Sequence, residues 1–197
     1  MNTKNKRLGV LVYVLIAVIA LGIGYAAISA ITLTINGSAT ANGKQDNFIV
    51  EFNDAAGKTT ISSTPNEIAS YDDSNGHVSN ASVTSTKTVG TFSLYGFATK
   101  NDYADVTFTV INRSPDLKAK LCESTINVTG GSASTFTSVA NLPSAVTEGT
   151  DKCITLNANG GETTIVVRTT LNVTPTIEDV SVNNIKVTFN ANPVQNS

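Results

Sequence analysis

The chain has 197 residues, of which 41% are hydrophobic, 6% aromatic and 14% charged, and its formal net charge is -2. Three of its 13 basic residues stand among the first thirty, which leaves ten to set against 15 acidic residues. No basic cluster remains that could neutralise phosphates, so nucleic acid is excluded as a partner. One histidine and two cysteines exclude a zinc site built from several such residues.

The first thirty residues have the pattern of a signal peptide or a membrane anchor. Three basic residues precede an uncharged, mostly apolar run over residues 8–31. This run predicts a hydrophobic helix long enough to span a bilayer. Either way the remainder of the chain is exported, so we expect a secreted or cell-surface protein that is released by cleavage or stays anchored. The predicted cleavage region contains the small residues Gly24, Ala26, Ala27 and Ala30.

From residue 31 onward apolar residues recur with period 2, which is typical of half-buried strands. Turn-forming pairs such as Asn36-Gly37 and Gly130-Gly131 separate these segments. The predicted fold class is all-β: an antiparallel, jelly-roll-like β-sandwich over residues 31–197, in one domain, preceded by the hydrophobic helix. Residues 70–87 are polar and are expected to form a long loop. The alternating apolar positions are Ile31, Leu33 and Ile35; Phe48, Val50 and Phe52; Val106, Phe108 and Val110; Ile165, Val167, Leu171 and Val173; and Ile185, Val187 and Phe189.

Cys122 and Cys153 are the only cysteines of the chain. An even pair in an exported protein is more often a disulfide than two free thiols. We therefore predict a bridge between a strand-like stretch over residues 117–128 and a second one that Cys153 opens. Two buried thiols are the alternative.

Several segments resemble the exported TasA and camelysin group of bacterial matrix proteins. They are the basic start, the apolar core with its exit Gly22-Ile23-Gly24-Tyr25-Ala26, and the strand at residues 31–35 that follows. The segments 106–119 and 161–171 are similar to that group as well. The resemblance implies a jelly-roll subunit that polymerises into extracellular fibres and donates an N-terminal strand to the next subunit. The chain departs from the group at residues 27–30, where the expected aromatic and acidic cleavage flank is missing, so the processing site stays open.

A donated strand also follows from the residues themselves. A sandwich that lacks a strand exposes backbone N–H and C=O groups, and an alternating strand from a neighbour would bond them while burying every second side chain. Ile31, Leu33 and Ile35 meet that requirement. The predicted partners are another copy of the chain and, before processing, the membrane. The alternative is that this strand pairs within its own domain.

The sequence predicts no enzymatic activity, cofactor or metal site. His77 is the only histidine, so neither a Ser-His-Asp triad nor a His-Glu-x-x-His zinc site is expected. Asp72, Asp73 and Asn75 lack the spaced acidic ligands of a calcium loop and are expected to form a solvated turn. No trio of Lys, Asn and an acid stands out for an isopeptide cross-link.

Two functions from different classes remain. The first is a structural protein that assembles into a fibre on the cell surface or in a biofilm matrix by N-terminal strand exchange. The second is a membrane-anchored monomeric sandwich that binds a glycan or a host protein through residues 70–87 and 130–151. Concentration-dependent filaments would favour the first, and a stable monomer retained in membranes the second.

Overall fold

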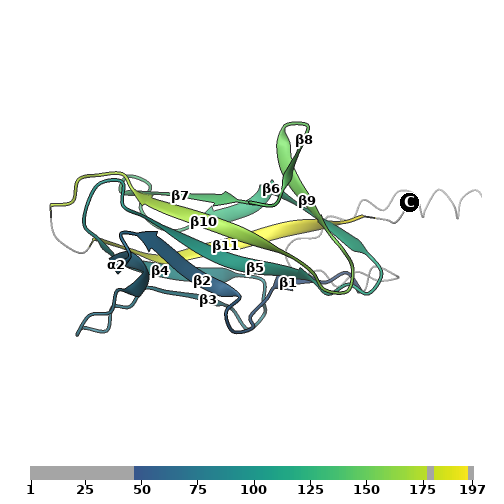
Figure 1. Cartoon of the computed structure of the whole chain (residues 1–197), viewed down its shortest axis with the longest axis horizontal. Coiled ribbons are helices and arrows are strands. Elements are labelled where there is room, and N and C mark those ends of the chain that lie inside the picture. Colours follow the sequence, from purple (N-terminus) through teal and green to yellow (C-terminus); the bar gives the residue numbers. More distant parts are fainter. Residues whose placement is uncertain (1–46, 177–179, 195–197) are drawn as a thin grey trace, which may run out of the picture. The chain divides into compact units, whose positions relative to one another are not determined.

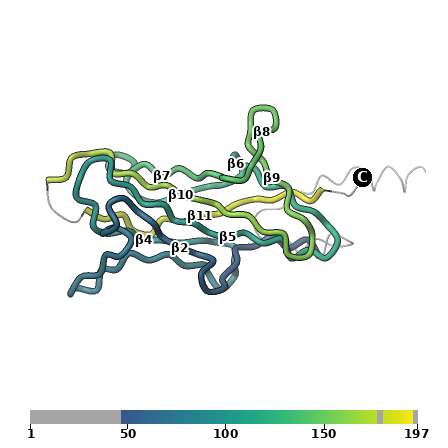
Figure 2. Tube along the Cα trace, viewed as in Figure 1, coloured from purple at the N-terminus to yellow at the C-terminus, as the bar shows by residue number. Residues whose placement is uncertain are grey.

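The computed structural model describes residues 47–176 and 180–194, which fold into two antiparallel sheets (Figures 1 and 2). The predicted hydrophobic helix, the cleavage residues Gly24, Ala26, Ala27 and Ala30, and the strand residues Ile31, Leu33 and Ile35 lie outside the described residues. None of the described helices is long and apolar enough to cross a membrane.

The first sheet has the order β1-β5-β10-β7, and β2 pairs with β5 next to β1. The second sheet has the order β3-β4-β11-β6-β9-β8. The first sheet contains β1 (Val50–Phe52), β2 (Thr59–Thr64), β5 (Tyr103–Asn112), β7 (Phe136–Asn141) and β10 (Gly161–Leu171). The second contains β3 (Asn80–Val83), β4 (Gly90–Phe97), β6 (Lys118–Thr129), β8 (Val146–Glu148), β9 (Asp151–Leu156) and β11 (Val180–Val194). A short helix, α2 (Glu67–Ser70), follows β2.

The inward side chains of the two sheets meet in one hydrophobic core. Aromatic rings make the contacts between the sheets: Phe52 of β1 meets Phe189 of β11 with ring centroids 4.9 Å apart, and Phe97 of β4 meets Phe136 of β7 at 4.9 Å. Each alternate residue of a strand points to the same face, so a period-2 apolar pattern buries one face and leaves the other in solvent. The antiparallel, sandwich-like arrangement predicted from that pattern is confirmed.

Gly90 begins β4 beneath the ring of Phe108 on β5. A Cβ atom at position 90 would lie 2.7 Å from Cε1 of Phe108 and 2.9 Å from its Cδ1. The Phe108 side chain is fully buried, and its ring has Phe52 at 5.4 Å and Phe92 at 6.4 Å between centroids. Only a residue without a side chain therefore lets the two sheets approach this closely here.

Asn112, at the end of β5, joins three segments at the bottom of the core. Its side chain is fully buried. Its Nδ2 donates to the carbonyl oxygens of Leu117 at 2.9 Å, Asn157 at 3.1 Å and Leu156 at 3.3 Å, and its Oδ1 accepts the N–H of Ser114 at 3.0 Å. One amide thus bonds backbone groups of the β5–β6 turn and of the end of β9 at a single buried point.

Three details of the sequence prediction are wrong. Residues 70–87, expected to be a loop, contain β3, and before it a hairpin in which Asp72 pairs with Val78. The pattern expected to run on to Val173 ends with β10 at Leu171. Four further strands were not predicted: β2, β4, β7 and β8. β2 and β7 are rich in Ser and Thr, and their pairing with neighbouring strands, rather than their own apolar pattern, makes them strands.

Candidate assembly site

Among the strands that the structure describes, β6 has a neighbour on both sides only over its first half. Strand β9 pairs with it from Ala119 to Cys122. Beyond that point, after a register shift between Leu121 and Ile126, β11 pairs with β6 from Ile126 to Thr129, but none of the described strands pairs with residues 124–129 on the other side. Strand β7, the outer strand of the first sheet, lies near this half of β6. Residues 124–129 together with β7 are termed the open side of the sandwich.

Apolar side chains at the open side point inward without being fully covered. Ile126 lies opposite Phe189 of β11, and Val128 lies opposite Val187. Phe189 and Val187 are buried, whereas Ile126 and Val128 are only half-buried, as is Ala140 of β7. An inward-facing side chain stays half-buried when no strand covers it from the side. At the open side, therefore, the described strands cover this part of the core only incompletely.

A pocket lies where β6 ends and β7 begins. The turn between these strands uses Gly130 and Gly131, which have φ values of 98° and 73°. A Cβ atom at Gly131 would lie 2.9 Å from Cδ1 of Ile185, so the glycine lets the turn rest directly on β11. The pocket is lined by Val128, Gly130, Gly131, Ala133, Phe136, Thr137 and Ser138.

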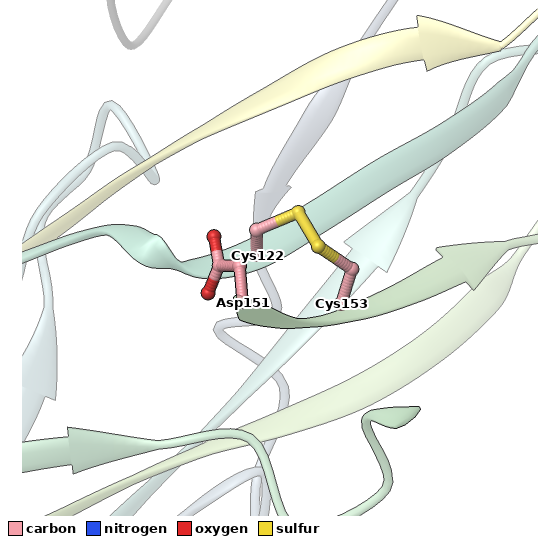
Figure 3. Close-up of side chains that lie close together, drawn as sticks. All are labelled: Cys122, Asp151 and Cys153. Carbon is pink, nitrogen blue, oxygen red and sulfur yellow. A yellow bond between two sulfur atoms is a disulfide. The ribbon is translucent and has the colours of Figure 1, made fainter. Parts of the chain in front are cut away.

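The predicted disulfide between Cys122 and Cys153 is present, and it lies at the last paired position of β6 and β9 (Figure 3). Beyond this position the two strands separate, and the β8–β9 hairpin turns away from the sandwich (Figure 1). The bridge therefore fixes the point at which the edge of β6 becomes free.

Asp151 lies beside the disulfide, with its carboxylate and the two sulfur atoms within 4.8 Å of one another. In the part of the chain that the structure describes, these residues are the only group of three potential metal ligands. The sulfurs are bonded to each other, so neither is a thiolate ligand. The hydroxyl of Ser124 donates to the Asp151 carboxylate and holds its pKa below the usual value, helped by the backbone N–H groups of Lys152 and Ser124. The carboxylate thus ties the start of the open edge to β9.

His77 and its neighbours form the solvated turn that the sequence predicts. Oδ1 of Asp73 accepts the N–H groups of Asn75 and His77 at 2.9 Å each, and Oδ2 lies 2.9 Å from Nδ1 of His77. The backbone hydrogen bond from His77, followed by that from its side chain, lowers the pKa of Asp73. The imidazole stacks on Tyr95 with centroids 5.3 Å apart.

The loop between β1 and β2 carries a further polar cluster that the sequence did not single out. Nζ of Lys58 lies 2.5 Å from Oε2 of Glu162, and Nδ2 of Asn53 donates to Oε1 of the same carboxylate at 2.7 Å. The hydrogen bond from Lys58, and after it the one from Asn53, lowers the pKa of Glu162. The three residues are separated by up to 109 positions, and only the pairing of β5 with β10 brings them together.

The structure thus joins two of the predicted site residues, Cys122 and Cys153, and leaves the predicted donor strand outside the described residues. The half-buried residues Ile126 and Val128 of the open side were not predicted as a site. The one signal in the sequence was the pair Ile126 and Val128, which resumes the apolar alternation of β6 after the register shift that separates it from Ala119 and Leu121. No family model, curated protein or solved structure matches this chain.

Proposed function

We propose that this chain is an exported, non-enzymatic structural protein of the cell surface, a jelly-roll-like subunit that assembles into fibres of the biofilm-matrix type. Each copy donates its segment with Ile31, Leu33 and Ile35 to the next copy. Before processing, the apolar N-terminal segment holds the chain at the membrane. The observation that carries this proposal is the open side, where a backbone edge and half-buried apolar side chains lack a neighbouring strand among the described residues.

The donor segment and the open edge of β6 share an alternating pattern and overlap in length. At about 3.3 Å per residue, the four residues 126–129 that pair regularly with β11 span about 13 Å, and the five residues 31–35 about 17 Å. In a strand paired to this edge, the three apolar residues point inward next to Ile126 and Val128, and Thr32 and Thr34 point to solvent. This is strand addition, in which backbone hydrogen bonds give affinity and alternate side chains give specificity.

The energy of the exchange is balanced closely enough for one side chain to decide it. Burying three large aliphatic side chains contributes about 1.5–3 kcal/mol each. Ordering five residues costs about 1–2 kcal/mol each. The two totals nearly cancel, so backbone hydrogen bonds and the central Leu33 determine whether the strand stays bound.

The first experiment changes the donor. In the processed protein, Leu33→Asp places a carboxylate on the inward face, whereas the matched control Thr32→Asp places the same charge one residue away on the outward face. We expect filaments from the wild type and from T32D, and monomers from L33D, in negative-stain electron microscopy and sedimentation velocity. Filaments of normal length from L33D would contradict the proposal.

The second experiment changes the acceptor. Val128→Asp introduces a charge into the open side, and Asn127→Asp adds it at the adjacent exposed position. V128D should retain a normal thermal transition yet form no filaments, whereas N127D should assemble. Because L33D keeps its acceptor and V128D keeps its donor, an equimolar mixture of the two should form dimers and nothing larger. Filaments from the mixture, or from V128D alone, would show that the exchange uses another edge.

One observation favours the second candidate function, a membrane-anchored binding module. Tyr71 and His77 of the hairpin before β3 flank Tyr95 of β4, and their rings stack on it with centroids 6.1 and 5.3 Å apart. Aromatic faces of this kind can stack on apolar faces of a glycan. A stable monomer whose retention on a glycan column is lost in Tyr95→Ala would support this function over assembly.

A further inference from the structure

Both ends of the loop between β1 and β2 are hydrogen-bonded to the same residue of β5. The N–H of Asn53 donates to the carbonyl oxygen of Thr109 at 2.8 Å, and the N–H of Thr109 donates to the carbonyl oxygen of Lys58 at 3.0 Å. The two loop ends are therefore held side by side. Glu162 faces them from β10, where it is paired with Ile111, two residues further along β5.

One carboxylate contacts both an amine and an amide. Glu162 accepts from Nζ of Lys58 at 2.5 Å through Oε2 and from Nδ2 of Asn53 at 2.7 Å through Oε1. Asn53 is 6% exposed, and its Oδ1 accepts the N–H of Ala55 at 3.1 Å. A donor at that oxygen polarises the carbonyl and stabilises negative charge that develops on it.

We propose that Lys58 and Asn53 form an intramolecular isopeptide bond, with Glu162 as the proton acceptor. The Lys58 ammonium gives a proton to the Glu162 carboxylate, and the neutral Nζ attacks Cγ of Asn53. The N–H of Ala55 supports the tetrahedral oxyanion. Nζ then loses its second proton, the Cγ–Nδ2 bond breaks, and Nδ2 leaves as ammonium with the two protons that Lys58 gave up and Glu162 transferred. An amide between Nζ and Cγ remains. No oxidant or other reactant is consumed.

The attacking species is the neutral amine, and the Lys58 side chain is 37% exposed. Base in the solvent therefore reaches the ammonium group and assists the proton transfer to Glu162, so the test is made at pH 9.

The bond gives the N-terminal strand a second attachment. β1 has three residues and leads directly into the 46 residues that precede the described part of the chain. With Asn53 linked to Lys58, a force that pulls on β1 is transmitted through the cross-link to the six residues of β2, and it bypasses the loop between them. This consequence is independent of whether the chain forms fibres.

The test is the intact mass of the full chain after reduction, followed by tryptic mapping. The wild type held at pH 9 should lose about 17 Da, the mass of ammonia, and trypsin should no longer cut after Lys58. A succinimide at Asn53 would also lose ammonia but would leave Lys58 cleavable. Lys58→Arg keeps the positive charge and removes the nucleophile, so K58R should keep its full mass. Lys120→Arg alters another lysine that is paired to a carboxylate, Glu148, and should react as the wild type does.

Glu162→Gln tests the proton acceptor and should slow the mass loss at least tenfold, in protein whose thermal transition shows that it is folded. If E162Q does not fold, the comparison of wild type with K58R decides alone, because both keep the carboxylate. An unchanged wild-type mass after prolonged incubation at pH 9, or a mass loss that persists in K58R, would overturn the proposal.

Discussion

Gly90→Ala tests the closest approach of the two sheets. The added Cβ would lie 2.7 Å from Cε1 of Phe108, about 1 Å inside an ordinary carbon–carbon contact. The ring cannot move away freely, because it is fully buried and packs against Phe52 and Phe92. Overpacking of this kind costs about 1–3 kcal/mol, and the lower entropy of the unfolded chain returns about 0.4–1 kcal/mol. We expect a net destabilisation of about 1–2 kcal/mol in urea unfolding.

The reasoning can be refuted with a double-mutant cycle. Phe108→Leu removes the part of the ring that the new methyl group meets, so Gly90→Ala should cost little or become stabilising in that background. The coupling between the two substitutions should be at least about 1 kcal/mol, with unchanged m-values. If G90A changes the free energy of unfolding equally in both backgrounds, contact with the Phe108 ring is not the reason why residue 90 is a glycine.

Three further predictions concern the disulfide, the hairpin and the buried amide. Cys122→Ala with Cys153→Ala opens a loop with a sequence separation of 31 and should cost about 3–4 kcal/mol, seen in calorimetry as a fall of about 10 °C; an unchanged transition would contradict this. Asp73 has a lowered pKa in the folded state, so the stability that its carboxylate contributes is present above the unfolded pKa and is lost as pH falls through the folded pKa. The free energies of unfolding of wild type and Asp73→Asn should therefore differ at pH 6 and converge near pH 2. The NMR chemical shift of the His77 N–H should follow the titration of the carboxyl group. Asn112→Ala leaves several buried backbone groups without partners and should cost about 2–4 kcal/mol in urea unfolding, whereas a loss below about 0.5 kcal/mol would show that water replaces the amide.

The core of the fold could be predicted from the sequence because period-2 alternation reports directly which face of a strand is buried. The segments around Phe108, Ile165 and Val187 carry this signal, and all three are core strands. Strands β2 and β7 carry few apolar residues. Whether they form strands depends on partners 39 to 49 residues away for β2 and 25 to 35 residues away for β7. A local pattern does not contain that information.

The same limit applies to the sites. The disulfide could be predicted because two cysteines allow one pairing only. The open side could not, because it depends on where β9 leaves β6, which is set by the position of Cys153 opposite Cys122 and not by a motif. The cluster of Lys58, Asn53 and Glu162 needed the register between β5 and β10, in which a shift of one residue would turn Glu162 to the opposite face.

The β8–β9 hairpin projects from the sandwich, and the disulfide lies at its base (Figure 1). Its tip is open at Gly149, where an added Cβ atom would meet nothing within 4 Å, and the residues of β8 are exposed. Tips of this kind accept foreign sequence readily. A short, cysteine-free epitope inserted after Gly149 should therefore leave the core intact and mark every copy of the protein for immunogold microscopy.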